Sequence, residues 1–440
     1  MTSLKLNGSS AGALPTPTPP AAQATAIATT RPRSIRTDRR ALIIAPLALL
    51  CCVWLWALVQ TGGVARGPRA VTFGGDFALN MSSAALLKQG GNPYDGNVLL
   101  RAEQAYMDRN GIPVQLGADQ APLTWGGYPP LFFWILEPLT SLPFHLVALL
   151  WIGLLLAVMI GGFIALLRYL GWKSLVIPSL IFAIMPQTTL EAYYANPTGL
   201  VVGLIFLALA LQRRHPLSAG LLFSLAFLKP QLAVPTLIAM TVFLVLDRRR
   251  FLTGVTLGVC ALVGASLATV GPHGLALWVH GLASVSAMVA SQPNMAPLIG
   301  LYAGWTAQPL RTCIEAVLAM AVLALTAREW YRGRAGSSAP FLAIAWLWVG
   351  WFLVLPYARF PDEILLAPAI LAFVGPDGRD LGRLAPATML YLIYFSALLF
   401  SAHLAGAQLL SLPLLVLLAV LYVHRSSETR ETTRAAVLSA

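Results

Sequence analysis

Long apolar runs recur along most of the chain and constrain its fold more than any other feature. The first covers residues 41–60, and about 20 apolar residues are enough for an α-helix to cross the hydrocarbon core of a bilayer. Charged residues make up only 10% of the sequence, whereas a soluble domain contains about 25%. This leaves too little ionisable surface to wet a globule of 440 residues, so a soluble enzyme is excluded.

Further apolar runs follow the first, and the predicted fold class is an all-α polytopic membrane protein with about 12 transmembrane helices. They lie near residues 144–167, 174–190, 198–212, 216–228, 232–246, 252–270, 305–327, 340–356, 363–375, 384–403 and 407–423. The two short runs on either side of Lys229-Pro230-Gln231 could instead form a broken pair.

The two ends of the chain have a different composition. Residues 1–40 combine a Pro/Thr/Ala stretch with a basic run, which predicts a disordered basic cytoplasmic tail. A signal peptide is the alternative for residues 41–60, but its charged segment is normally short, and here it would fill residues 1–40. We therefore expect a retained span, a membrane domain over residues 41–424 and a cytoplasmic C-terminal tail over residues 425–440.

Lysine and arginine gather in alternate loops between the apolar runs. The loops concerned contain Arg168 and Lys173, Arg213 and Arg214, Arg248 to Arg250, Arg328 to Arg334, and Arg379 and Arg383. Cytoplasmic loops carry such an excess, so the pattern predicts a multi-pass protein of the cell inner (plasma) membrane with both termini in the cytoplasm. Topology thus explains the net charge of +12, and no nucleic-acid partner is expected because no nucleic-acid-binding motif occurs.

Several kinds of chemistry lack their sequence signals. The short cytoplasmic loops leave no room for a nucleotide-binding domain, and no Walker A, GxGxxG or HExxH pattern occurs. No Asp-x-Asp pair is present to hold a divalent cation, and the four cysteines have no zinc-type spacing. We therefore expect neither ATP-driven transport nor metal-dependent use of nucleotide sugars, and no cofactor or metal.

The first extracytoplasmic loop, residues 61–143, is the most informative polar region. A loop of this length in a compact protein is usually functional. It carries Asp76, Asp95, Glu103, Asp108, Asp119 and Glu137 among glycine, proline and aromatic residues. The partly amphipathic segment 77–88 predicts a helix lying at the membrane interface. A second outer loop is expected over about 271–304.

Four motifs, taken in order, resemble those of glycosyltransferase family 87. They are Phe73-Gly-Gly-Asp76-Phe77, Gly90-Gly-Asn-Pro-Tyr94-Asp95, Tyr128-Pro129-Pro130-Leu131 and Leu228-Lys229-Pro230-Gln231. This family contains membrane glycosyltransferases of the GT-C class, which use polyprenyl-phosphate sugars. The resemblance implies a GT-C-like helical domain, a polyprenyl-phosphate donor, mannose as the hexose, a lipid or glycan acceptor, and reaction on the outer face with inversion.

The resemblance implies that Asp76 is the catalytic base, because GT-C enzymes use an acidic residue just after the first span. A carboxylate at an apolar interface could accept the proton of an acceptor hydroxyl. The alternative is structural: aspartate is a favoured N-cap, and Asp76 could merely cap the helix that follows it.

Two cations are expected to bind the donor phosphate. Lys229 lies between apolar runs, where a cation is costly unless it is paired or functional; alternatively it snorkels to lipid headgroups. Arg359 could hold phosphate bidentately or could pair with Asp362 or Glu363.

The remaining expected substrate contacts are Asn92, Tyr94, Tyr128, Asn196, Gln231 and Asp362. For the two tyrosines the alternative is an aromatic belt at the membrane interface. For the two asparagines it is a turn beside Pro93 or Pro197.

A secondary transporter or flippase for a lipid-linked sugar is the rival function. Transporters place ionisable residues near the midplane of two corresponding halves. Here the acidic residues gather at the outer mouth, and the main charges inside a span, Arg311 and Glu315, could simply pair with each other at i,i+4 spacing. The sequence therefore favours the enzyme.

Overall fold

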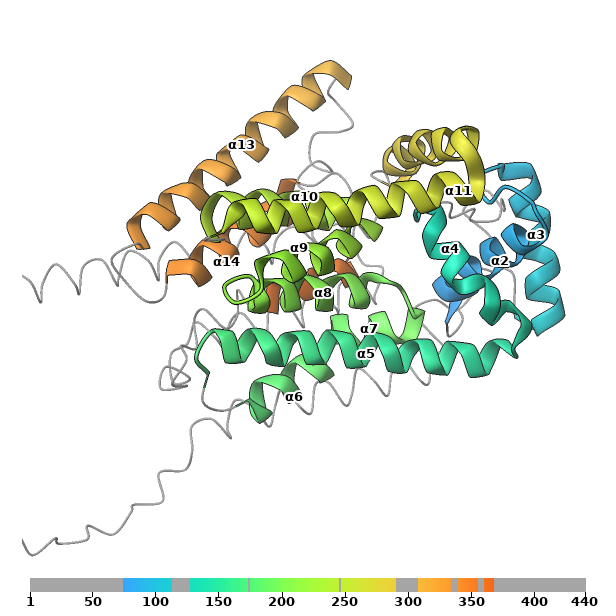
Figure 1. Cartoon of the computed structure of the whole chain (residues 1–440), viewed down its shortest axis with the longest axis horizontal. Helices are drawn as coiled ribbons and strands as arrows, with labels where there is room; N and C mark the ends of the chain where they lie inside the picture. Colours follow the sequence, from blue (N-terminus) through green and yellow to red (C-terminus); the bar gives the residue numbers. More distant parts are fainter. Residues whose placement is uncertain are drawn as a thin grey trace, which may run out of the picture. The chain divides into compact units, whose positions relative to one another are not determined.

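The computed structural model describes residues 74–112, 127–172, 175–244, 247–289, 308–333, 339–354 and 360–367. The α-helices in these ranges are α2 (Gly75–Lys88), α3 (Gly96–Asn110), α4 (Pro130–Leu136), α5 (Phe144–Tyr169), α6 (Val176–Ile184), α7 (Pro186–Tyr194), α8 (Thr198–Leu211), α9 (Pro216–Ser224), α10 (Pro230–Ala239), α11 (Arg248–Val289), α13 (Gln308–Gly333) and α14 (Ala339–Val354). Short helical segments are η1 (Glu137–Ser141), η2 (Leu225–Leu228), η3 (Met240–Leu244) and η4 (Phe360–Leu366). These ranges contain no strand, and the helical fold class is confirmed for them (Figure 1).

Two helices in the described ranges are long and apolar enough to cross a membrane. They are α5, which matches the predicted run 144–167, and residues 248–282 of α11. Shorter apolar helices cover residues 198–211, 216–228 and 230–242. The predicted run 174–190 is not one helix, because Met185 adopts an extended conformation and separates α6 from α7. Runs 41–60, 384–403 and 407–423 and both terminal tails lie outside the described residues.

Large apolar side chains cover the outer faces of several helices. They include Leu149 and Leu150 on α5, Leu217 and Leu221 on α9, Leu257 and Val263 on α11, and Val317 and Met320 on α13. A soluble monomer rarely exposes apolar patches of this extent. These faces support helices that contact lipid.

Glycines let neighbouring helices approach closely. On α5 and α8, a Cβ added to Gly162 or Gly203 would collide with the backbone of the opposite helix. The same holds for Gly220 on α9 and Gly254 on α11. Small residues at such contacts are typical of membrane helices, whose association depends on close packing and not on burial from water.

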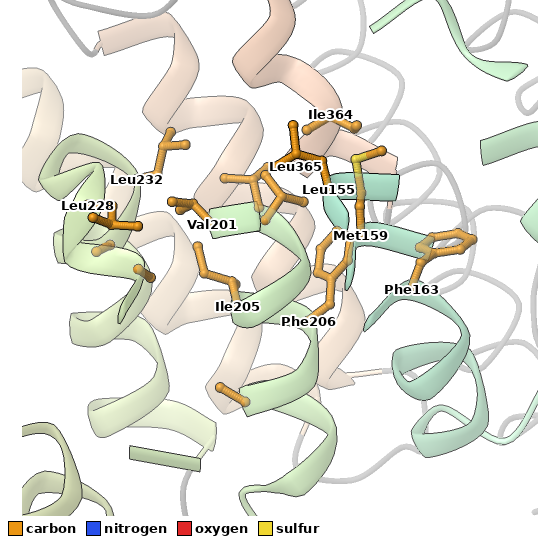
Figure 2. Packing of buried hydrophobic residues seen from close by; sticks show 14 of the residues in the cluster. Leu155, Met159, Phe163, Val201, Ile205, Phe206, Leu228, Leu232, Ile364 and Leu365 are labelled. Atoms are coloured by element: carbon orange, nitrogen blue, oxygen red, sulfur yellow. The ribbon is translucent and has the colours of Figure 1, made fainter. Parts of the chain in front are cut away.

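The hydrophobic core lies between α5, α8, α10 and η4. Figure 2 shows side chains from these elements meeting, and each of those named here is buried. They are Leu155, Met159 and Phe163 from α5, Val201, Ile205 and Phe206 from α8, Leu232 from α10, and Ile364 and Leu365 from η4. The core thus joins η4, late in the chain, to the earlier helices.

Both predicted outer loops contain helices in the part of the chain that the structure describes. The segment 77–88 is helical as predicted, residues from Phe77 to Ala84 are buried, and α2 packs against α3, α4 and η1. Its position at the membrane interface stays a prediction. The predicted outer loop 271–304 is helical as far as Val289, after a kink at Gly271, whose φ is 68°.

Candidate active site

A glycine turn sets the position of Asp76. Gly74 adopts a left-handed conformation with φ 72°, and its N–H donates to Tyr193 O at 2.8 Å, which ties the start of α2 to the end of α7. Asp76 then lies in the first turn of α2 and is half-buried. The N-cap alternative is wrong, because Gly74 is the N-cap and no side chain caps this helix.

Asn196 holds the Asp76 carboxylate. Its Nδ2 donates to Asp76 Oδ2 at 2.6 Å, across 120 residues of sequence. The preceding residue, Ala195, has φ 54°, a strained conformation for a non-glycine residue, and its carbonyl accepts from Trp151 Nε1 at 3.0 Å. The turn before Pro197 therefore aims the Asn196 amide at the Asp76 carboxylate. Asn196 thus takes part in the expected turn and also makes a side-chain contact within the site.

The other end of the Asn196 amide accepts several hydrogen bonds. Its Oδ1 accepts from Thr198 N at 3.0 Å and from Tyr128 OH at 3.3 Å, and it lies 2.8 Å from Thr198 Oγ1. Tyr128 O accepts from Tyr94 OH at 2.7 Å. Asn92 Oδ1 accepts from Tyr94 N at 3.0 Å, which closes a local turn. Four of the predicted site residues thus join the Asp76 site through hydrogen bonds.

Lys229 lies in the break between two helical segments. It follows η2 and precedes Pro230 at the start of α10, with its side chain only 6% exposed. Its Nζ donates to Asp362 Oδ1 at 2.9 Å and also to Thr198 Oγ1. Snorkelling to headgroups is therefore wrong for this lysine, because Asp362 balances its charge inside the protein.

Thr198 links the two halves of the site. Its Oγ1 lies 3.0 Å from Asp362 Oδ1 as well as beside Asn196 Oδ1. One continuous chain of contacts therefore runs from Asp76 through Asn196 and Thr198 to Lys229 and Asp362. Gln231 lies next to this chain, and its carbonyl accepts from Trp351 Nε1 at 3.0 Å.

Comparison with protein families decides which class of protein this is. The family model of glycosyltransferase family 87 matches residues 126–356, more than half of the chain. The chain belongs to glycosyltransferase family 87. Tyr128, Asn196, Thr198 and Lys229 lie inside the matched residues, whereas Asp76 and Asp362 lie outside them. Neither a curated protein nor a solved structure matched the chain significantly.

Membership of the family makes this protein a glycosyltransferase and favours the enzyme over the rival transporter. A glycosyltransferase needs a base for the acceptor hydroxyl and stabilisation for the leaving group. Asp76 is a half-buried carboxylate, and within the described part of the chain only its Oδ2 receives a hydrogen bond. Its geometry therefore suits a base that binds an acceptor hydroxyl through Oδ1.

Glu191 of the glycosyltransferase was not selected from the sequence. It is 1% exposed, and its Oε2 accepts from Gly199 N at 3.2 Å. Burial raises its pKa well above the ordinary value; Lys229 opposes this shift, and the charges of Asp362 and Asp76 add to it. A sequence signal existed, since Glu191 is the only charged residue between Lys173 and Arg213.

Arg359 lies outside the described residues, and so does its proposed pairing with Asp362 or Glu363. In the ranges the structure covers, no group of three histidine, cysteine or acidic residues is arranged to hold a metal ion.

Proposed function

We propose that this glycosyltransferase transfers a hexose from a polyprenyl phosphate to a lipid or glycan acceptor on the extracytoplasmic face of the plasma membrane. Mannose is the proposed sugar on the family resemblance. The observation that carries the proposal is the continuous chain of contacts from the half-buried Asp76 carboxylate to the buried Lys229 and Asp362 pair. These contacts connect a carboxylate that can accept a proton, Asp76, to a cation that can stabilise a leaving phosphate, Lys229.

In the proposed reaction Asp76 removes the proton of the acceptor hydroxyl. The hydroxyl oxygen attacks the anomeric carbon, and the bond from that carbon to the phosphate oxygen breaks as the new glycosidic bond forms. The polyprenyl phosphate departs with the bonding electrons, and the single displacement inverts the anomeric centre. A positioned general base contributes about 10²- to 10⁴-fold to such a step.

Lys229 is the proposed cation on the leaving-group side, with Arg359 as the second. Asp362 keeps the lysine charge balanced before the donor binds, and a phosphate close to the pair would share its ammonium group. Asn92, Tyr94, Tyr128 and Gln231 are the proposed substrate contacts, since they line the same network or lie next to it. The proposed topology keeps about twelve spans and both termini in the cytoplasm.

The donor class is tested with membranes that contain the protein, a panel of lipid and glycan acceptors, and radiolabelled mannose. One reaction receives polyprenyl-phosphate mannose, and a parallel reaction receives the nucleotide sugar with synthesis of the lipid donor blocked. We expect labelled product only from the lipid donor, and none from membranes without the protein. Transfer from the nucleotide sugar with no lipid intermediate would reject the proposal.

A further inference from the structure

We infer that Asn196 is the positioning residue of the Asp76 base: its side-chain amide orients the carboxylate and couples it to the Lys229 and Asp362 pair. The inference rests on the proposed function, because it takes Asp76 as the base. A direct contact with sugar hydroxyls, expected from the sequence, is not needed for this role.

The hydrogen bonds around Asn196 leave one orientation for its amide. Oδ1 faces one obligatory donor, the backbone N–H of Thr198 at 3.0 Å, and it also accepts from the hydroxyl of Tyr128 at 3.3 Å. An amide NH₂ group cannot accept from an N–H. Turning the amide over would also set its oxygen against the Asp76 carboxylate. Nδ2 must therefore face Asp76 Oδ2, where it lies at 2.6 Å.

The backbone of Asn196 is fixed from both sides. Its N–H donates to Glu191 O at 3.3 Å at the end of α7, and Pro197 restricts the backbone conformation of Asn196, the residue before it. Trp151, from α5, holds the carbonyl of Ala195. A group anchored in this way loses little entropy when it binds the carboxylate, which is what a positioning residue requires.

The same amide connects the two chemical ends of the site. One side of it binds the base, and the other side binds Thr198, whose hydroxyl accepts from Lys229 and lies 3.0 Å from Asp362. A shift of the amide would therefore move the base relative to the leaving-group cation. A misplacement of about 1 Å between reacting groups can cost about 10²-fold in rate.

Steady-state kinetics with polyprenyl-phosphate mannose and an accepted acceptor test the role. For Asn196→Ala we expect kcat to fall about 10²-fold, with KM for the donor changed less than about twofold. Asn110→Ala is the matched control. The Asn110 side-chain amide is also partly buried and donates a hydrogen bond to Tyr106 O at 2.8 Å, but it lies on α3, away from the hydrogen bonds around Asp76. It should retain wild-type kcat.

Two further variants keep the inference falsifiable if Asn196→Ala folds poorly. Asn196→Asp preserves the shape of the side chain and the oxygen that accepts from Thr198 and Tyr128, but it removes the N–H that donates to Asp76. Its kcat should therefore fall at least as much as that of Asn196→Ala. In an Asp76→Asn background, Asn196→Ala should cause no further loss, because residues that act as a unit are non-additive.

The outcomes separate the inference from the proposed function. If Asp76→Asn is inactive while both Asn196 variants keep wild-type kcat, the positioning role is overturned and the base remains. A loss from Asn196→Ala that multiplies the loss from Asp76→Asn also overturns it. If Asp76→Asn itself stays active, the proposed base fails first.

Discussion

Lys229 shows how one buried charge is accommodated. Its side chain is 6% exposed and that of Asp362 is 1% exposed, so neither charge is stabilised by water. Each depends on the other and on Thr198. Removing one partner of such a pair leaves a buried uncompensated charge, which costs far more than loss of an exposed pair.

Lys229→Met should therefore destabilise the protein by about 3–5 kcal/mol. The exposed pair of Arg250 and Asp247, 3.5 Å apart, provides the control, and Asp247→Asn should cost no more than about 1 kcal/mol. Thermal unfolding in detergent, followed by tryptophan fluorescence, compares the two. Equal decreases in Tm for the two variants would contradict the larger stability cost expected for the buried pair. Lys229→Met with Asp362→Leu should regain stability but not activity.

Glu191 gives a prediction for pH. Because burial raises the folded-state pKa of Glu191 above the ordinary value, its protonated form stabilises the fold. That contribution is complete below the ordinary glutamate pKa and is lost as pH rises toward the raised value. Glu191→Gln keeps an oxygen for the Gly199 N–H and cannot ionise, so its Tm should fall less than the wild-type Tm as pH rises. If Tm changed with pH in the same way for both proteins, Glu191 would be charged in the folded protein and its pKa would not be raised.

At the scale of elements, breaks between helices build the site. Asp76 follows the Gly74 turn, Asn196 follows the left-handed Ala195, and Lys229 precedes Pro230. The sequence signalled these breaks through glycine and proline, and the family motifs marked Asp76 and Lys229. It could not signal that Lys229 pairs with Asp362, because 133 residues separate them and no local pattern records a distant partner.

Close helix packing predicts opposite effects for two glycines. In Gly203→Ala the added methyl group collides with the backbone of α5 at Val158, so this variant should lose about 1–3 kcal/mol. In Gly153→Ala the methyl group meets nothing within 4 Å, and a helix gains about 0.5–1 kcal/mol from alanine. Tm in detergent should therefore move down for the first and stay or rise for the second. A similar Tm for both would mean that α5 and α8 do not pack this closely.

For the whole molecule, composition alone predicted a helical membrane protein, and α5 matches its predicted run within a few residues. The burial of α2 could not be predicted, since an isolated pattern of apolar residues does not show that α3, α4 and η1 cover the helix. Glu191 was missed although it is the only charged residue between Lys173 and Arg213, because only the fold shows that Gly199 and Lys229 lie around it.

The candidate membrane span in α11 predicts how Cys260 reacts. This thiol lies on the candidate span of α11 and is exposed, so lipid should surround it. With the other three cysteines replaced by serine, a charged maleimide should label Cys260 only after the protein is unfolded in a denaturing detergent, because a charged reagent does not enter the hydrocarbon core of a bilayer. Asp108→Cys, at an exposed position on α3, should label in open membranes without detergent. Rapid labelling of Cys260 without detergent would contradict the span.

The most direct measurement is single-turnover transfer of radiolabelled mannose from polyprenyl phosphate by wild-type, Asp76→Asn and Asp108→Asn proteins. Asp108 is an exposed acid on α3 and serves as the matched control. We expect Asp76→Asn to slow transfer by at least about 10²-fold while donor binding is retained, and Asp108→Asn to equal wild type. Wild-type transfer by Asp76→Asn would contradict the role of Asp76 as the base.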